Sequence, residues 1–245
     1  TPLYSSAASD VYKRQAQYPR FTLGPVTLTL QPGDRVALLG RNGTGKSTLL
    51  ALMAGLRQPE HGTVSGVPGG DDRQLTLRRD VAYVGAALQA LPWHSVQEHF
   101  RFMAQMYEGW NTDRALALAH ELALDVGATT GTLSRGNTVK LNLATAWGRQ
   151  ADVLLLDEPT AGLDPIARTD LLRELRRTIH AFPNAIVVYA THLLDELHEI
   201  DPTRLLVLRD GMVHSHDGDA MAQLDVAALT ALLTDAPRRS TPEVA

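Results

Sequence analysis

Hydrophobic residues in this chain fall into short continuous runs and into longer stretches with helical spacing. Three short runs are rich in Val, Ile, Leu and Ala, as expected of parallel strands buried on both faces: residues 36–39, 153–156 and 185–188. Longer stretches repeat apolar positions at helical spacing: residues 97–108, 112–124 and 165–180. The pattern therefore predicts buried strands and amphipathic helices.

Local signals mark where some of these elements begin and end. We expect Thr112 to cap the helix that follows it. Asp164 and Pro165 are typical of a helix start, with the aspartate as the cap and the proline at the first helical position. Asp210-Gly211 separates two β-rich segments within residues 205–213, and this dipeptide predicts a hairpin turn.

A glycine-rich loop lies between the first buried strand and a helix-like stretch over residues 48–56. It fits the phosphate-loop pattern G-x-x-x-x-G-K-[ST], read as Gly40, Arg41, Asn42, Gly43, Thr44, Gly45, Lys46, Ser47 and Thr48. Glycines let backbone N–H groups turn toward phosphate oxygens, and a helix N-terminus adds free donors. In this pattern Lys46 reaches the β- and γ-phosphates and Ser47 ligates Mg²⁺. We therefore expect Gly40 and residues 42–48 to bind a nucleoside triphosphate.

A pair of acidic residues ends the second buried strand. A carboxylate at the carboxyl end of a parallel strand points into the crevice where ligands of α/β sheets lie. Asp157 is expected to hold Mg²⁺, and Glu158 to orient or deprotonate an attacking water. Together with the phosphate loop, the pair predicts phosphoryl transfer to water.

Three further segments resemble the ATP-binding subunits of ABC transporters. Thr160–Pro165 is similar to the D-loop of that family, and Tyr189–His192 is similar to its strand end with a switch histidine. Leu133–Asn137 stands where the family has its LSGGQ signature. The resemblance covers residues 17–217, with the motifs in the family's order and spacing. Each motif alone is weak evidence for the family, but all of them in this order are specific to it.

The resemblance implies an α/β fold: a P-loop NTPase core with a parallel sheet, an N-terminal antiparallel β portion and an inserted helical subdomain over about residues 87–150. The alternating and β-branched residues 21–30, followed by a turn signal at 31–34, support the β portion. With no internal repeat, we expect a single ABC-type ATP-binding domain over residues 16–235.

Two subunits of this family sandwich ATP head to tail. The resemblance implies that Ser134 and Gly136 contact the γ-phosphate bound to Lys46 of a second subunit, and that Asp164 lies at the seam. It also implies that His192 senses the γ-phosphate. The expected catalytic residues are Glu158, His192 and Lys46. Tyr18 is expected to stack on adenine, although a tyrosine at a β edge is the alternative.

The chain departs from the family pattern at two places. Arg135 and Asn137 replace a glycine and a glutamine of the signature, and Arg135 resembles the LSRG-type signatures of a bacterial exporter subgroup. Ala86 stands where the family has the glutamine of its Q-loop, and Gln89 follows three residues later. Alanine cannot ligate Mg²⁺ or orient water, so reduced hydrolysis is an open alternative.

The two ends of the chain differ from the rest. Residues 10–15 can be encoded by GAT GTG TAT AAG AGA CAG, which resembles a transposon-end adapter. We therefore expect residues 1–15 to be non-native and to form no structure. Residues 236–245 contain two prolines and two arginines and are expected to form a loose tail.

Composition limits the partners. The net charge of −4 argues against a general nucleic-acid binder, and no apolar run is long enough to span a bilayer. The resemblance implies ATP and Mg²⁺ as cofactors, a second ATP-binding subunit, and a transmembrane permease that holds the chain at the cytoplasmic face of the membrane. Trp93 and His94 lie where such a permease docks, although Trp93 is equally expected as a core residue.

The sequence is compatible with three functions. The first is an ATP-hydrolysing subunit that couples dimer closure to a separate transmembrane subunit. The second is a weakly hydrolysing regulatory subunit, suggested by Ala86 and Arg135. The third is a soluble ABC ATPase outside transport, although the chain lacks the tandem domains or coiled-coil insertion usual in those relatives.

Overall fold

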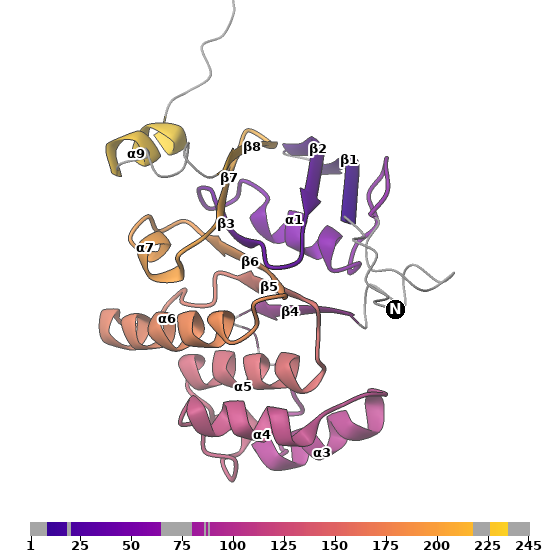
Figure 1. Cartoon of the computed structure of the whole chain (residues 1–245), viewed down its shortest axis with the longest axis vertical. Coiled ribbons are helices and arrows are strands. Elements are labelled where there is room, and N and C mark those ends of the chain that lie inside the picture. The colour runs from indigo at the N-terminus through magenta and orange to yellow at the C-terminus, as the bar shows by residue number, and fades with distance from the viewer. Residues whose placement is uncertain are drawn as a thin grey trace, which may run out of the picture.

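The structure is a computed structural model that describes residues 9–18, 21–64, 80–85, 87, 89–217 and 226–234. Its centre is a six-stranded sheet with the order β4-β5-β6-β3-β7-β8 (Figure 1). The strands are β3 (Arg35–Leu39), β4 (Val81–Gly85), β5 (Val153–Asp157), β6 (Ile186–Thr191), β7 (Arg204–Arg209) and β8 (Met212–Asp217). Neighbours are parallel except β7 and β8, so the predicted parallel-dominated α/β sheet is confirmed.

A second, antiparallel sheet joins β1 (Ser9–Tyr18) and β2 (Phe21–Leu30). The expectation that residues 1–15 form no structure is wrong for Ser9–Gln15, because the backbone of this segment pairs with β2, beginning with Ser9 opposite Leu30. Residues 1–8 lie outside the described residues. Tyr18 is the last residue of β1, but its side chain is not among those described, so stacking on adenine stays a prediction.

Helices cover both faces of the central sheet (Figure 1). The helices of the described residues are α1 (Lys46–Met53), α3 (Val96–Met106), α4 (Thr112–Glu121), α5 (Arg135–Gly148), α6 (Pro165–His180), α7 (Glu196–Ile200) and α9 (Val226–Thr234), with a short 3₁₀ turn, η1, at Thr130–Thr132. Successive side chains of β5 point to opposite faces of the sheet, so they contact different helices. Leu155 packs with α1 and β2, whereas Leu154 and Leu156 pack with α5 and α6.

The strand order sets the position of the candidate site. β5, β6 and β3 are parallel neighbours, so their carboxyl ends lie at one edge of the sheet. β3 leads into the glycine-rich loop, β5 ends at Asp157, and β6 is followed by His192. Three motifs that are far apart in the sequence therefore meet at this edge.

Three helices, α3, α4 and α5, pack together around a cluster of their own, which includes Phe100, Ala119 and Leu141. Within this part Nε2 of His99 lies 3.0 Å from Oγ1 of Thr145 and joins α3 to α5. The helices lie inside the range expected for a helical subdomain, whose outer boundaries stay a prediction.

Local signals predicted two elements correctly and one incorrectly. Asp164 caps α6, and Pro165 is in its first turn. Asp210 and Gly211 form the β7–β8 turn with φ of 49° and 77°, as a type I′ turn requires. The expectation that Thr112 is a cap is wrong, because Asn111 has the extended backbone of a cap and its side chain accepts the N–H of Arg114.

Within the part of the chain that the structure describes, no helix has both the length and the apolar character needed to cross a membrane.

Candidate active site

The loop between β3 and α1 depends on glycine at three positions. Gly43 and Gly45 have φ of 80° and 103°, a region that other residues rarely adopt. A Cβ at Gly40 would lie 2.8 Å from the carbonyl oxygen of Leu208 and from Oγ1 of Thr44. The backbone therefore follows a path that side chains would prevent, as in a loop built to bring N–H groups close to a ligand.

Lys46 begins α1 and points back into this loop. Its side chain is buried, and Nζ donates to the carbonyl oxygens of Gly40 (2.7 Å) and Arg41 (3.1 Å). No side chain caps the start of α1, whereas α3, α4, α5 and α6 each begin with a capping side chain. The first N–H groups of α1 thus have no side-chain acceptor, which suits a bound anion.

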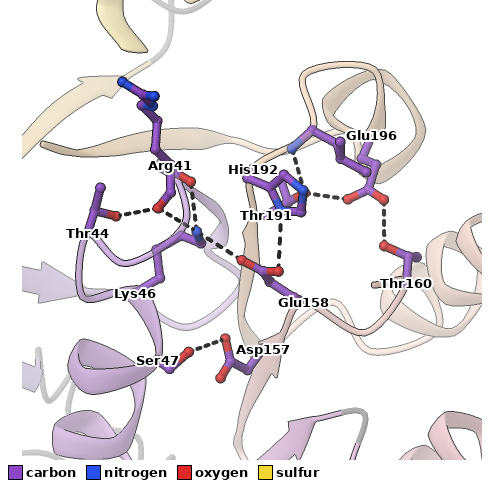
Figure 2. Close-up of polar contacts among 12 residues, drawn as sticks. Arg41, Thr44, Lys46, Ser47, Asp157, Glu158, Thr160, Thr191, His192 and Glu196 are labelled. Carbon is purple, nitrogen blue, oxygen red and sulfur yellow. Dashed lines mark hydrogen bonds and ion pairs between the residues drawn. The ribbon is translucent and has the colours of Figure 1, made fainter. Parts of the chain in front are cut away.

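Glu158 lies between Lys46 and His192 (Figure 2). Its Oε1 is 2.9 Å from Nζ of Lys46, and its Oε2 is 3.3 Å from Nδ1 of His192. Apart from this contact with Glu158, that Nδ1, which is shielded from solvent, has no hydrogen-bond partner among the described residues. Glu158 has a φ of 45°, unusual for a residue with a side chain, and such strained positions are frequent at functional sites.

Asp157 accepts hydrogen bonds on both carboxylate oxygens. Oγ of Ser47 donates to Oδ1 at 3.1 Å, and the hydroxyl of Tyr83 donates to Oδ2. Burial, and then the bond to Asp157, raise the pKa of Tyr83 above its usual range, so the hydroxyl keeps its proton and acts as a donor. The hydroxyl of Ser47 and the carboxylate of Asp157 are the hard oxygen ligands that Mg²⁺ prefers, so the pair fits that ion.

The segment after β4 is held by two amide side chains. Nε2 of Gln89 donates to the carbonyl oxygen of Tyr83 at 3.0 Å. Nδ2 of the buried Asn142, on α5, donates to the carbonyl oxygens of Gly85 (3.1 Å) and Ala87 (2.8 Å). Ala86, at the expected Q-loop position, lies outside the described residues. The amide nitrogen of Gln89 is thus bound to backbone in this structure.

The signature segment lies beside the D-loop. Ser134 caps α5 by accepting the N–H of Asn137 at 3.2 Å. The guanidinium of Arg135 covers Gly162, where a Cβ would lie 2.5 Å from Nη1. Gly162 also has a φ of 75°, so glycine is required there for two reasons. Within the described residues, Ser134 and Gly136 make no hydrogen bond with the phosphate loop.

Apart from Tyr18, whose side chain is not described, the expected site residues form two groups. The first group lies at the edge shared by β3, β5 and β6: the loop from Gly40 to Thr48, Asp157, Glu158 and His192. The second group is near the start of α5 and α6: Ser134, Gly136 and Asp164. Sequence reasoning missed Tyr83, although its position on the strand before Ala86 could have drawn attention to it.

Comparisons with known proteins found a family model and relatives that match this chain. The family model described as ABC transporter matches residues 23–161. The aliphatic sulfonates import ATP-binding protein SsuB 1 of Rhodococcus jostii (strain RHA1) is 33% identical over 216 residues, which cover 81% of this chain and 81% of that protein. The cytochrome c biogenesis ATP-binding export protein CcmA of Bradyrhizobium diazoefficiens is 37% identical over 167 residues, covering 66% of this chain and 79% of that protein.

A solved structure described as the ATP binding subunit of an ABC transporter has the same fold. It aligns with a TM-score of 0.74 and 26% sequence identity, and the alignment covers 92% of this chain and 98% of that one.

Proposed function

The chain belongs to the ABC transporter family, and we propose that it binds ATP at the β3–α1 loop and hydrolyses it to drive a separate membrane permease. Its relatives include both an import and an export protein, so the proposal covers the ATPase step and not the direction of transport.

One observation supports this function most strongly. Lys46, Glu158 and His192 come from three different parts of the sequence, and their side chains converge within ion-pair distance (Figure 2). A cation that can bind phosphate, a carboxylate that can accept a proton and an imidazole that can hydrogen-bond a phosphate oxygen form the set of groups that ATP hydrolysis needs.

The reaction assigned to this site is attack of water on the γ-phosphorus of ATP. The bond from the γ-phosphorus to the bridging oxygen breaks, and ADP and phosphate are formed. Glu158 accepts the proton of the water, while Lys46 and the N–H groups of the loop hold the phosphate oxygens. His192 donates a hydrogen bond to the γ-phosphate. Glu158 lies within ion-pair distance of both Lys46 and His192.

Mg²⁺ would be held by Ser47 and Asp157, whose side chains already meet at 3.1 Å. When bound, the ion neutralises charge on the phosphate oxygens. Tyr83 keeps the second carboxylate oxygen of Asp157 oriented by a hydrogen bond.

A second subunit is required in this proposal. Arg135 covers Gly162 and Gly136 lies near Leu163, whereas Ser134 and Gly136 make no hydrogen bond with their own phosphate loop within the described residues. They remain available to the ATP of another copy or of a related subunit, with Asp164 at the seam. The γ-phosphate then joins two subunits, and hydrolysis separates them.

In this proposal the permease docks at Trp93 and His94, where the family resemblance places that contact. Trp93 is 70% exposed, so the alternative that it is a core residue is wrong. Docking there would hold the subunit at the cytoplasmic face of a membrane.

Calorimetry with Mg-ATP tests the proposal directly. We expect one ATP to bind per chain, and no binding by Lys46→Ala at the same concentration if circular dichroism shows that the variant is folded. The matched variant Lys140→Ala removes a lysine of an ion pair with Glu174, outside the site, and should bind as the parent does. Absence of ATP binding by the folded parent chain would disprove the function.

A weakly hydrolysing regulatory subunit is the second candidate. The observation in its favour is that the amide nitrogen of Gln89 is bound to the carbonyl of Tyr83, while the family's Q-loop position is Ala86. Steady-state hydrolysis separates the two candidates. A rate equal to that of Glu158→Gln would favour the regulatory role, and a much higher rate would favour the catalytic one.

A further inference from the structure

Glu196 is a buried carboxylate that no part of the proposed reaction uses. It begins the short helix α7 and is 1% exposed. A buried carboxylate is unfavourable unless hydrogen bonds replace its lost hydration. No ion pair of Glu196 occurs among the described residues, so neutral donors must supply that compensation.

Three hydroxyl groups do so. Oε1 of Glu196 accepts from Oγ1 of Thr160, and Oε2 accepts from Oγ1 of Thr191 and from the hydroxyl of Tyr189 at 2.9 Å. All three donors are buried. Burial, and then the charge of Glu196, raise the pKa of Tyr189 well above its usual range, so this hydroxyl also remains protonated.

The donors belong to the two segments that carry the expected catalytic groups. Thr160 lies two residues after Glu158, and Thr191 immediately precedes His192 (Figure 2). Glu196 therefore connects the loop after β5 to the end of β6. The same two segments also meet where Oε2 of Glu158 lies 3.3 Å from Nδ1 of His192.

Two other contacts also connect the chain after β5 to β6 or to the segment that follows β6. The N–H of Glu158 donates to the carbonyl oxygen of Ala190 at 3.1 Å, and Arg168 on α6 pairs with Asp195 at 2.8 Å. The Arg168 pair is partly exposed, so water and salt weaken it. The hydroxyls around Glu196 are shielded from both, which makes Glu196 the stronger of the side-chain connections.

We propose that Glu196 is a positioning residue for ATP hydrolysis: it fixes the segment of Glu158 relative to His192, so that both groups reach the same γ-phosphate. The proposal rests on the function proposed above. Glu196 touches neither substrate nor water in this role, and it acts through Thr160 and Thr191.

The decisive variants alter one hydroxyl or one charge without changing size. Thr160→Val removes the donor on the Glu158 side, and Glu196→Gln removes the charge and one acceptor. We expect both to lower kcat about tenfold or more, because misplacing a single catalytic group commonly costs that much. The Kd for Mg-ATP should stay within about threefold of the parent value, since the phosphate loop is unaltered.

Two controls distinguish positioning from stability. Thr160→Ser restores the hydroxyl and should recover most of the kcat lost in Thr160→Val. Thr178→Val removes a buried threonine on α6 whose hydroxyl binds the backbone of Glu174, and it should keep the parent kcat. Thermal unfolding of each variant fixes a temperature at which all of them are folded.

The outcomes distinguish a failure of the proposed function from a failure of the role of Glu196. A parent chain that does not hydrolyse ATP overturns the proposed function together with this inference. An active parent with active Thr160→Val and Glu196→Gln variants overturns only the role of Glu196. Equal losses in Thr160→Ser and Thr160→Val, or losses that disappear once all variants are folded, also overturn that role.

Discussion

Nζ of Lys46 lies 2.9 Å from Oε1 of Glu158, and this ion pair connects the start of α1 to the end of β5. The lysine is 4% exposed and the glutamate 26% exposed, so the pair is shielded on the lysine side. Phosphate and Glu158 are both anionic partners for the same lysine. In the proposed function, a bound phosphate competes with Glu158 for Lys46, and the carboxylate that it releases is available as a base.

The first prediction concerns Glu158→Gln. Loss of the base should lower the hydrolysis rate about a hundredfold or more. Affinity for Mg-ATP should be unchanged or higher, because one anion beside Lys46 is lost. Calorimetry and a steady-state phosphate assay measure the two effects.

The matched control for this prediction is Glu174→Gln. It removes a glutamate from an ion pair with Lys140 at 3.1 Å, outside the site, and should change neither quantity. Weaker binding of Mg-ATP by Glu158→Gln would contradict the competition between phosphate and glutamate for Lys46.

The second prediction concerns Ser47→Ala. If the Ser47 hydroxyl ligates Mg²⁺, this variant should weaken ATP binding roughly tenfold with Mg²⁺ present and leave it unchanged in EDTA. Titrations under the two conditions provide the comparison. Ser215→Ala removes another serine bonded to an aspartate, Asp217, and should have no effect on either. An equal loss with and without the metal would show that Ser47 does not act through the ion.

The third prediction concerns Tyr83→Phe, which removes the hydroxyl bonded to Asp157. Partners that orient metal ligands commonly change metal affinity 10- to 100-fold, and we expect a loss of about tenfold for Mn²⁺ bound with ATP. Electron paramagnetic resonance of Mn²⁺ reports this loss without reference to activity. Tyr107→Phe is the control, a half-buried tyrosine that lies under Arg149. Unaltered Mn²⁺ affinity in Tyr83→Phe would show that Tyr83 does not contribute to metal binding.

The fourth prediction concerns pH and the helical part. Burial, and then the charge of His94, lower the pKa of His99 from 6.5 to about 4. Between these values the unfolded chain binds a proton that the folded chain does not. The free energy of unfolding should therefore fall as pH is lowered from 6.5 toward 4, by up to about 1 kcal/mol per pH unit from this residue, and its contribution is constant above that range.

Urea unfolding of His99→Gln measures that contribution. The variant should show a shallower dependence on pH than the parent between pH 4.5 and 6.5. His120→Gln removes an exposed histidine on α4 and should keep the parent slope. Identical slopes for His99→Gln and the parent would mean that His99 is not protonated differently in the two states.

Much of the site could be predicted because its signals are local. The phosphate loop needs glycines at fixed spacing, and the turn angles of Gly43 and Gly45 explain that need. Asp164 and Pro165 specify a helix start by their own hydrogen bonding and φ, and the structure has that start. Such signals need no knowledge of what packs against them.

The remaining features depend on partners that are remote in sequence. Tyr83 reaches Asp157 because β4 and β5 pair in parallel with Tyr83 opposite Leu155, a register that no local pattern specifies. Glu196 is one of several acids in its stretch, and only the folded chain brings Thr160 to it. The error at Thr112 has a local cause: Asn111 is an equally good cap one residue earlier.

Helix α5 belongs to two hydrophobic clusters at once. Leu141 and Ala144 face α3 and α4, whereas Leu143 and Ala146 face the central sheet. We expect α3 and α4 to open and reclose as a cooperative unit, with amide hydrogens that exchange before those of β5 and β6. The amides of α5 would keep their protection during that opening, so this helix would report on global unfolding although it packs directly against α3 and α4.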